Sequence, residues 1–269
     1  MGESESGQVS ASAAKVYEEF YIPGLFAEWP PRVIDAADIV VGQRVLDVAC
    51  GTGVLAQAVA DRVGPSGSTV GVDINEAMLS IAKEKLSEIE WRKAPAEALP
   101  FDDLSFDSVV SQFGLMYFED QQLALTEMMR VLKPGGTLAI AVWDKLENCP
   151  GYYIEEQLFL RVLGDEYADE SPYSLGDTQK LTQLFASAGI SNARIQTHTG
   201  TARFASIEEW IYTDVNGWTV DDAVEGEDYE RLLGEAEQDL AQFLTPEGTV
   251  AFATPAHIVT ASKQDQKGV

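Results

Sequence analysis

Short apolar runs alternate with helix-length segments between about residues 45 and 143, and this alternation restricts the folds open to the chain. Runs rich in β-branched residues predict strands, and the amphipathic segments between them predict helices. A strand–helix–strand order places successive strands in one parallel sheet. We expect strands at "RVLDVAC", "SGSTVGVDI", "IEWRKAP", "FDSVVSQFGLMYF" and "TLAIAVW", and helices at "VLAQAVADRV", "EAMLSIAKEKL" and "DQQLALTEMMRVL".

The second half of the chain continues the alternation with further helical segments. Helices inserted between late strands would stand over the carboxyl edge of the sheet, where open α/β folds bind ligands. We expect late strands near 193–204 and 256–263, and helices near 150–163, 177–188, 206–218 and 227–244.

These elements predict an α/β fold with a Rossmann-like, mostly parallel seven-stranded sheet, helices on both faces and a helical cap from the C-terminal half. No internal repeat and no linker rich in Pro or Gly divides the chain, so we expect a single domain over 1–269. Within it we expect a disordered tail over about 1–12, a cofactor-binding core over 13–145 and a substrate cap over 146–255.

The charge and the cysteine content narrow the range of partners. The chain has 18 Lys and Arg against 44 Asp and Glu, a net charge of −26. Nucleic acid binds through basic surface, so we expect no nucleic-acid partner. The sequence has neither a long apolar run nor a secretion signal, so we expect no membrane span and a cytoplasmic location. Cys50 and Cys149 have no metal-ligand spacing, which predicts buried free thiols and no metal site.

The turn after the first expected strand has the spacing Gly51-x-Gly53, which suits a bound nucleotide. Glycines let the main chain approach a ligand closely, and the following helix presents free N–H groups. Asp73 lies 20 residues beyond Gly53, at the end of the second strand, where its carboxylate can accept the hydroxyls of a ribose. NAD(P) and S-adenosylmethionine fit this unit equally well, so an NAD(P)-dependent oxidoreductase is the alternative interpretation.

Asp47 helps to separate these two cofactors, because it is an acid inside the first strand, four residues before Gly51. A carboxylate buried beside a pyrophosphate would be costly. Beside a zwitterionic amino acid it can serve the ammonium group, directly or through water. Asp47 therefore favours S-adenosylmethionine.

Four ordered segments, "VLDVACGTG", "VGVDINEAM", "AEALPFDDLSFDSVVSQFGLMYF" and "MMRVLKPGGTLAIAVW", closely resemble class I S-adenosylmethionine-dependent methyltransferases. Within that superfamily they look most like the group that includes the quinone C-methylating enzymes. The resemblance covers about residues 15–145. It implies an enzyme that transfers a methyl group from S-adenosylmethionine to an O, N, S or C atom of a small-molecule metabolite, by in-line displacement.

The resemblance also implies a set of cofactor-binding residues. Gly51 and Gly53 match the residues that cradle the methionine part, and Asp73 matches the acid that holds the ribose. Ile74 and Met78 match the pair that sandwiches the adenine. Further positions match the adenine edge (Ala96 and Glu97) and the end of strand four, beside cofactor and substrate (Gln112 and Phe113).

Two features depart from this pattern or add to it. The family often has an Asp just before "AEALPF", where this chain has Pro95, so Glu97 or main-chain atoms would contact the adenine amino group. The segment "YEEFYIPGLFAEWPPRVID" resembles the helix that precedes the first motif. Its aromatic residues favour packing against the sheet. The alternative is a lid over the cofactor and substrate, since aromatic faces attract the sulfonium cation, and we expect Tyr21 and Trp29 to be cofactor or pocket residues.

Methyl transfer requires alignment of the reactants rather than a catalytic triad or a metal, so we assign no catalytic residue. His198 and His257 are candidate bases by residue type alone, and we expect both to be structural. The fourth expected strand ends in "SQFG", which differs from the Asn/Asp-Pro-Pro-aromatic pattern that resembles enzymes methylating the amino groups of nucleic-acid bases. Trp210 is expected in the hydrophobic core of the cap. The expected acceptor-pocket residues are Tyr17, Tyr117, Trp143, Tyr153 and Trp218.

Overall fold

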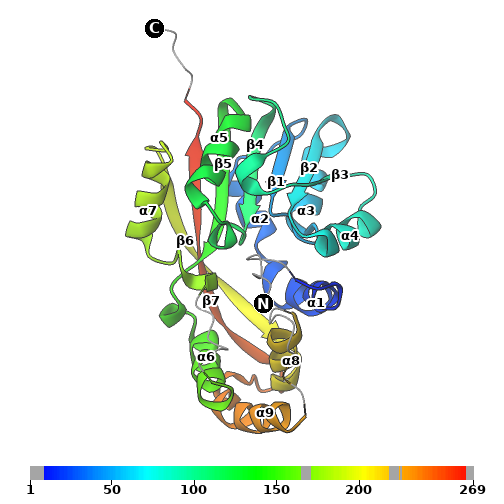
Figure 1. The fold of residues 1–269 in the computed structure, drawn as a ribbon, viewed down its shortest axis with the longest axis vertical. Helices are drawn as coiled ribbons and strands as arrows, with labels where there is room; N and C mark the ends of the chain where they lie inside the picture. Colours follow the sequence, from blue (N-terminus) through cyan, green and yellow to red (C-terminus); the bar gives the residue numbers. More distant parts are fainter. Residues whose placement is uncertain (1–8, 165–170, 218–223, 225, 265–269) are drawn as a thin grey trace.

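A computed structural model describes residues 9–164, 171–217, 224 and 226–264. They form one seven-stranded sheet in the order β3-β2-β1-β4-β5-β7-β6, in which the first five strands are parallel and β7 is antiparallel to both neighbours (Figure 1). The sheet predicted from the sequence is confirmed. The strands are β1 (Arg44–Val48), β2 (Ser68–Asp73), β3 (Glu90–Lys93), β4 (Phe106–Gln112), β5 (Leu132–Trp143), β6 (Arg194–Phe204) and β7 (Val250–Ser262).

Helices cover both faces of the sheet because strands are added on both sides of β1, first β2 and β3 on one side and then β4 and β5 on the other. Right-handed crossovers place the helices that precede β2 and those that precede β5 on opposite faces. Accordingly α2 and α3 pack together, whereas α5 packs against β5 and α7. The helices are α1 (Ala11–Val16), η1 (Tyr17–Phe26), α2 (Pro30–Ala36), α3 (Val54–Val63), α4 (Glu76–Lys85), α5 (Gln121–Val131), α6 (Pro150–Val162), α7 (Thr178–Ser187), α8 (Ile207–Gly217) and α9 (Glu227–Asp239).

Local chemistry accounts for where several of these elements begin. The Asn75 side chain accepts a hydrogen bond from the Met78 amide at 3.0 Å and so caps the start of α4. The Ser10 hydroxyl caps α1 in the same way. Residues 11 and 12 are therefore helical, and the disordered tail predicted there is wrong, because a serine cap satisfies the free amides of the first turn. The remainder of that predicted tail, 1–8, lies outside the described residues.

Three strand boundaries differ from the sequence expectation. Strand β5 begins at Leu132, five residues before the predicted start at Thr137. Strand β4 ends at Gln112, and the rest of the apolar run "FGLMYF" turns over the edge of the sheet. Strand β7 begins at Val250, six residues before the predicted start. An apolar run predicts which residues are buried but not where a strand begins or ends. The differences at the end of β4 and at the start of β7 follow from that.

The strands β6 and β7 extend past the sheet and carry the cap. β7 pairs with β5 only over 256–262, whereas it pairs with β6 over 250–260. The two strands continue as a ribbon beyond the carboxyl edge, where α6, α8 and α9 cover it (Figure 1). Trp210 is fully buried there and packs against Phe252 with ring centroids 4.5 Å apart, so its predicted place in the cap core is confirmed.

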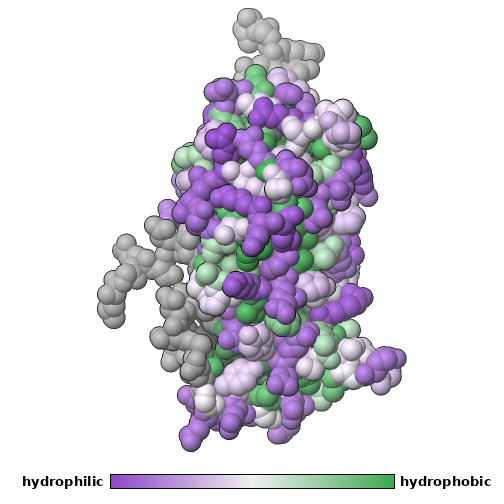
Figure 2. Space-filling view, turned by 90° about the vertical axis from the view of Figure 1, so that its right-hand side faces the viewer, coloured by the Kyte–Doolittle hydropathy of each residue, from purple (hydrophilic) through white to green (hydrophobic). Residues whose placement is uncertain are grey.

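The surface is polar and the cysteines are buried. Figure 2 shows one face of the molecule that is mostly hydrophilic. Among the described residues no helix is both long enough and apolar enough to cross a bilayer. Cys50 and Cys149 are free and buried, as the sequence predicts.

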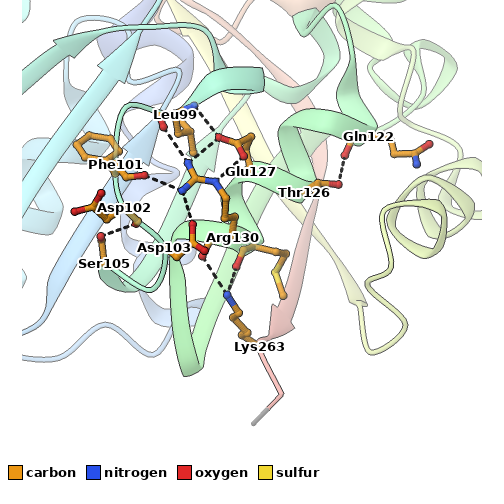
Figure 3. Close-up of polar contacts among 11 residues, drawn as sticks. Leu99, Phe101, Asp102, Asp103, Ser105, Gln122, Thr126, Glu127, Arg130 and Lys263 are labelled. Carbon is orange, nitrogen blue, oxygen red and sulfur yellow. Dashed lines mark hydrogen bonds and ion pairs between the residues drawn. The ribbon is translucent and has the colours of Figure 1, made fainter. Parts of the chain in front are cut away.

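Arg130 of α5 holds the "LPFDD" segment against the core (Figure 3). Its guanidinium donates to the carbonyls of Leu99 at 3.0 Å and Phe101 at 2.8 Å, and to the Asp103 carboxylate at 2.8 Å. It also pairs with Glu127 on its own helix, whose second oxygen accepts from the Leu99 amide. Arg130 and Glu127 thus form a polar clamp between α5 and the "LPFDD" segment.

We expect Arg130→Ala to lower the free energy of unfolding by ~2–4 kcal/mol, because two carbonyls lose their donors and Glu127 loses its partner. Chemical denaturation measures this change. The matched control is Arg92→Ala, which removes an exposed ion pair with Glu90 and should cost under ~1 kcal/mol. Equal losses in the two variants would contradict the clamp.

Candidate active site

A cavity opens at the carboxyl edge of the sheet, where β1 and β4 lie side by side and the strand order reverses. Open α/β sheets bind ligands at this switch point. The cavity is bounded by the strand ends, by η1 and by the cap helices α6 and α8. The residues predicted from the sequence that line it are Tyr17, Tyr21, Gly51, Asp73, Ile74, Met78, Gln112, Phe113, Tyr117 and Trp143.

The loop after β1 is fixed by the carboxylate at the end of β2. One oxygen of Asp73 accepts from the Gly51 amide and the other from the Asn75 amide, both at 2.8 Å. Burial raises the pKa of Asp73, while these amide donors favour its ionised form. The loop and the acid that were singled out from the sequence therefore form one hydrogen-bonded unit.

The two glycines of the loop serve different purposes. Gly51 has a φ of 54° and lines the cavity, and a Cβ there would lie 3.9 Å from the Tyr17 hydroxyl. Gly53 has a φ of 90°, and its Cβ would lie 2.7 Å from the Trp91 ring. Gly53 is outside the residues that line the cavity, so packing against Trp91, rather than approach of a ligand, requires the glycine there.

Asp47 is a buried acid without a matched partner. It is 1% exposed, and neither of its oxygens makes a hydrogen bond of normal geometry within the described residues. Burial, and then repulsion from Asp73, raise its pKa, whereas the amide of Ala56 favours the ionised form. A buried carboxyl group of this kind stabilises a cationic ligand group placed close to it.

Both central strands end in backbone conformations that are unusual for residues with a side chain. Ala49 after β1 and Phe113 after β4 each have a φ of 57°, and both line the cavity. A Cβ at Gly114 would lie 2.5 Å from the Ala49 Cβ, so the two strand ends are in close contact. Strained backbone of this kind is concentrated at functional sites. Nothing in the residue type marks Ala49, and the sequence analysis missed it.

A cluster of aromatic rings forms one wall of the cavity. Phe113 stacks on Trp143 with centroids 3.7 Å apart, and Phe26 lies 6.0 Å from Trp143. Trp29 is 0% exposed and packs edge-on against Phe113 and Trp143. It supports the wall from behind and is not among the cavity-lining residues, so the structure places it one layer behind the position expected from the sequence.

The helix η1 spans the cavity from the glycine loop to the cap. Tyr17 lies beside Gly51, and burial, with Asp73 nearby, raises its pKa. Tyr21, one turn further, donates its hydroxyl proton to the Asp214 carboxylate of α8. One helix therefore contacts the residues at both ends of the cavity.

The model of the ubiE/COQ5 methyltransferase family matches residues 20–207. The chain belongs to this family. The demethylmenaquinone methyltransferase of Staphylococcus carnosus is 35% identical over 188 residues, which are 64% of this chain and 78% of the relative. This family membership makes the chain an S-adenosylmethionine-dependent methyltransferase that acts on a small molecule, and no finding supports the oxidoreductase alternative.

Solved methyltransferases share the fold at low sequence identity. The phosphoethanolamine N-methyltransferase 2 of Haemonchus contortus is 18% identical with a TM-score of 0.61, and the match covers 95% of this chain and 58% of that one. An S-adenosylmethionine-dependent methyltransferase from Aquifex aeolicus is 19% identical with a TM-score of 0.55, and the match covers 93% and 98%. These likenesses concern the architecture.

Several predicted residues of this ubiE/COQ5-family chain lie outside the cavity lining. Tyr153 is 43% exposed on the outer side of α6, and its neighbour Tyr152 lines the cavity instead, because a helix turns about 100° per residue. Glu97 accepts a hydrogen bond from the Asp120 amide, and Ala96 is buried next to it. Trp218 falls outside the described residues.

The two histidines have structural surroundings. His257 is buried, with Nδ1 2.9 Å from the Thr197 hydroxyl and Nε2 3.0 Å from the Gly176 carbonyl and 3.2 Å from Asp144. Neither His257 nor His198 is among the residues that line the cavity. We therefore assign neither as a base.

The cap contributes acids to the cavity that the sequence analysis missed. Glu155 of α6 and Asp214 of α8 both line it and hydrogen-bond to each other. Burial raises the pKa of Glu155 well above its ordinary value and that of Asp214 to about 6. The spacing of Glu155 with Tyr152 and Phe159 on one face of the helix was the available signal.

Asp214 should make stability depend on pH. Its pKa is near 6 in the folded chain and ~3.9 when unfolded, so the folded chain binds more protons between those values. Its contribution to the free energy of unfolding therefore falls as pH rises through that interval. We expect the stability of the wild type to decrease relative to Asp214→Asn between pH 4.5 and 6.5, on the order of 1–3 kcal/mol.

Denaturation curves of both proteins across this pH range measure the difference. The control is Glu208→Gln, which removes an exposed acid from the same helix α8 and should track the wild type. A constant difference between wild type and Asp214→Asn at every pH would contradict the raised pKa.

Proposed function

We propose that the cavity holds S-adenosylmethionine along the ends of β1 and β2, and that the methyl acceptor lies between the aromatic wall and the cap. The hydrogen bond from the Gly51 amide to Asp73 supports this most directly. It joins a loop that allows close approach to an acid suited to a ribose, at the switch point of the sheet.

The residues at this end of the cavity fit the parts of the cofactor. Asp47 would serve its ammonium group, directly or through water, and Gly51 would contact the methionine part. Asp73 retains free lone pairs for the ribose hydroxyls. Ile74, which is 37% exposed, and Met78 offer apolar surface for the adenine. A pyrophosphate would instead meet Asp73 in the cavity lining, with Asp47 buried behind the lining and no basic residue among the described lining residues.

S-adenosylmethionine supplies a methyl group on a positively charged sulfur that leaves as a neutral thioether. The protein's task is to align the acceptor atom with that methyl group and to exclude water. Tyr17, Phe113 and Trp143 would perform both functions, because their rings border the cavity and are largely buried. Gln112 has a side-chain oxygen without a hydrogen-bond partner among the described residues, so it can accept a hydrogen bond from a donor group on the methyl acceptor.

A ring-shaped molecule is one candidate for the methyl acceptor. The Staphylococcus relative is named for such a molecule, demethylmenaquinone. The stacked rings of Phe113 and Trp143 favour a flat molecule. The acidic composition supports a function without nucleic acid, and the free buried cysteines support a cytoplasmic location.

We expect Asp73→Ala to weaken S-adenosylhomocysteine binding by ~1–3 kcal/mol, about tenfold to a hundredfold in Kd. The substitution removes the charge-assisted bonds to the ribose and frees the Gly51 loop. Isothermal titration calorimetry measures the affinity.

The control for this measurement is Asp61→Asn on the exposed face of α3, which should bind like the wild type. Unchanged affinity in Asp73→Ala would overturn the assignment of the loop. Micromolar binding of NADH by the wild type would overturn the choice of cofactor.

A further inference from the structure

Two carboxyl groups meet at the cap end of the cavity, opposite the glycine loop. Glu155 from α6 is 5% exposed, lines the cavity, and has one oxygen, Oε1, without a hydrogen-bond partner among the described residues. Its side chain is hydrogen-bonded to Asp214 from α8, which in turn accepts a hydrogen bond from the Tyr21 hydroxyl. A buried oxygen with unused hydrogen-bonding capacity in a cavity wall is a position for a donor on a ligand.

The described lining of the cavity is acidic at this end. Among the described residues that line the cavity there is no Lys, Arg or His, and Glu156 adds a third carboxyl group. Burying carboxyl groups without a cation costs free energy unless a ligand supplies the missing charge. The observed arrangement therefore suits a positively charged ligand group.

Aromatic faces surround the same place. Tyr152 and Tyr173 line the cavity beside Glu155, with ring centroids 6.4 Å apart, and Tyr21 lies on the other side. The glycine at position 217 admits the Tyr21 ring against α8, since a Cβ there would lie 2.9 Å from Cε2 of that ring. Aromatic faces around carboxyl groups recognise ammonium ions through cation–π attraction combined with ion pairing.

Two cations could use this place, the sulfonium of the cofactor and an amine of the acceptor. The sulfonium belongs to the loop end, where Asp47 and Asp73 already lie and where Tyr17 contacts Gly51. The paired acids contact Tyr21, which lies one helical turn after Tyr17 on η1, toward the cap. This separation favours the acceptor as the source of the charge.

We propose that the Glu155–Asp214 pair binds a protonated amine of the methyl acceptor and takes up its proton, so that the acceptor is an amine methylated at nitrogen. This inference rests on the proposed function and names its substrate class. In the proton step the N–H bond breaks with its electron pair left on nitrogen, and an O–H bond forms at Oε1 of Glu155. The proton that Glu155 already shares with Asp214 in their hydrogen bond passes at the same time to Asp214, so the pair gains one proton in all.

Two further observations agree with this assignment. Burial raises the pKa of both acids, which brings their proton affinity closer to that of an amine held in the cavity. Asp214 also lies beyond residue 207, where the match to the family model ends. The acceptor end is thus built partly from a segment that the family does not prescribe.

The test is binding of matched amine and alcohol probes to the full chain saturated with S-adenosylhomocysteine. Phenethylamine is compared with 2-phenylethanol, and benzylamine with benzyl alcohol, by calorimetry at pH 7.5. We expect each amine to bind at least tenfold more tightly than its alcohol. Glu155→Gln should reduce this ratio to near one, whereas Glu208→Gln on the surface of α8 should preserve it.

Measurements with the cofactors separate the two proposals. If Glu155→Gln binds S-adenosylhomocysteine like the wild type and loses only the preference for amines, both proposals are supported. Should the variant fail to fold, Asp214→Asn is used in its place. If the wild type does not bind S-adenosylhomocysteine, the proposed function itself is overturned.

Three outcomes would overturn the amine assignment while leaving the cofactor site intact. The first is equal affinity of the wild type for amines and alcohols, or binding of neither. The second is a tenfold preference that persists in Glu155→Gln. The third is a selective loss in Glu155→Gln of affinity for S-adenosylmethionine over S-adenosylhomocysteine, which would assign the acids to the sulfonium.

Discussion

The carboxylate of Asp73 is the interaction on which the site depends. It ends β2 and accepts amide protons from the loop after β1 and from the start of α4, so one side chain fixes three elements. The left-handed backbone at Ala49 and Gly51 persists because this bond and the contact between Ala49 and Gly114 hold it. Without that carboxylate the buried amide of Gly51 would lack an acceptor and the loop would lose its defined shape.

The position of the cap follows from strand length rather than from a separate domain interface. β7 enters the sheet antiparallel between β5 and β6, and its first residues extend past Trp143 at the end of β5. The projecting ribbon needs cover on its apolar side, where Phe252 of β7 packs against Trp210 of the cap helix α8. The same packing brings Glu155 and Asp214 to the cap end of the cavity.

The sequence was sufficient for the sheet, for the loop and for the acid at the end of β2, because these depend on local periodicity and on a fixed spacing along the chain. It was insufficient wherever contacts join distant segments. The hydrogen bond between Tyr21 and Asp214 spans 193 positions, and no local pattern marks it. Tyr153 was predicted to line the cavity in place of Tyr152 because residue type alone does not show which face of a helix points inward. Trp29 was predicted to line it because residue type does not distinguish an aromatic side chain in a cavity wall from one that packs behind the wall.

The acids of the cavity differ in kind from those that give the chain its net charge of −26. Exposed carboxylates are hydrated, and salt screens them beyond a Debye length of about 8–10 Å near physiological ionic strength. Glu155 is buried and Asp214 is partly buried, and tyrosines line the cavity beside them. Their preference for a cationic ligand is therefore set by desolvation and short-range contact, and it should hold in salt that suppresses attraction of the same ligand to the surface.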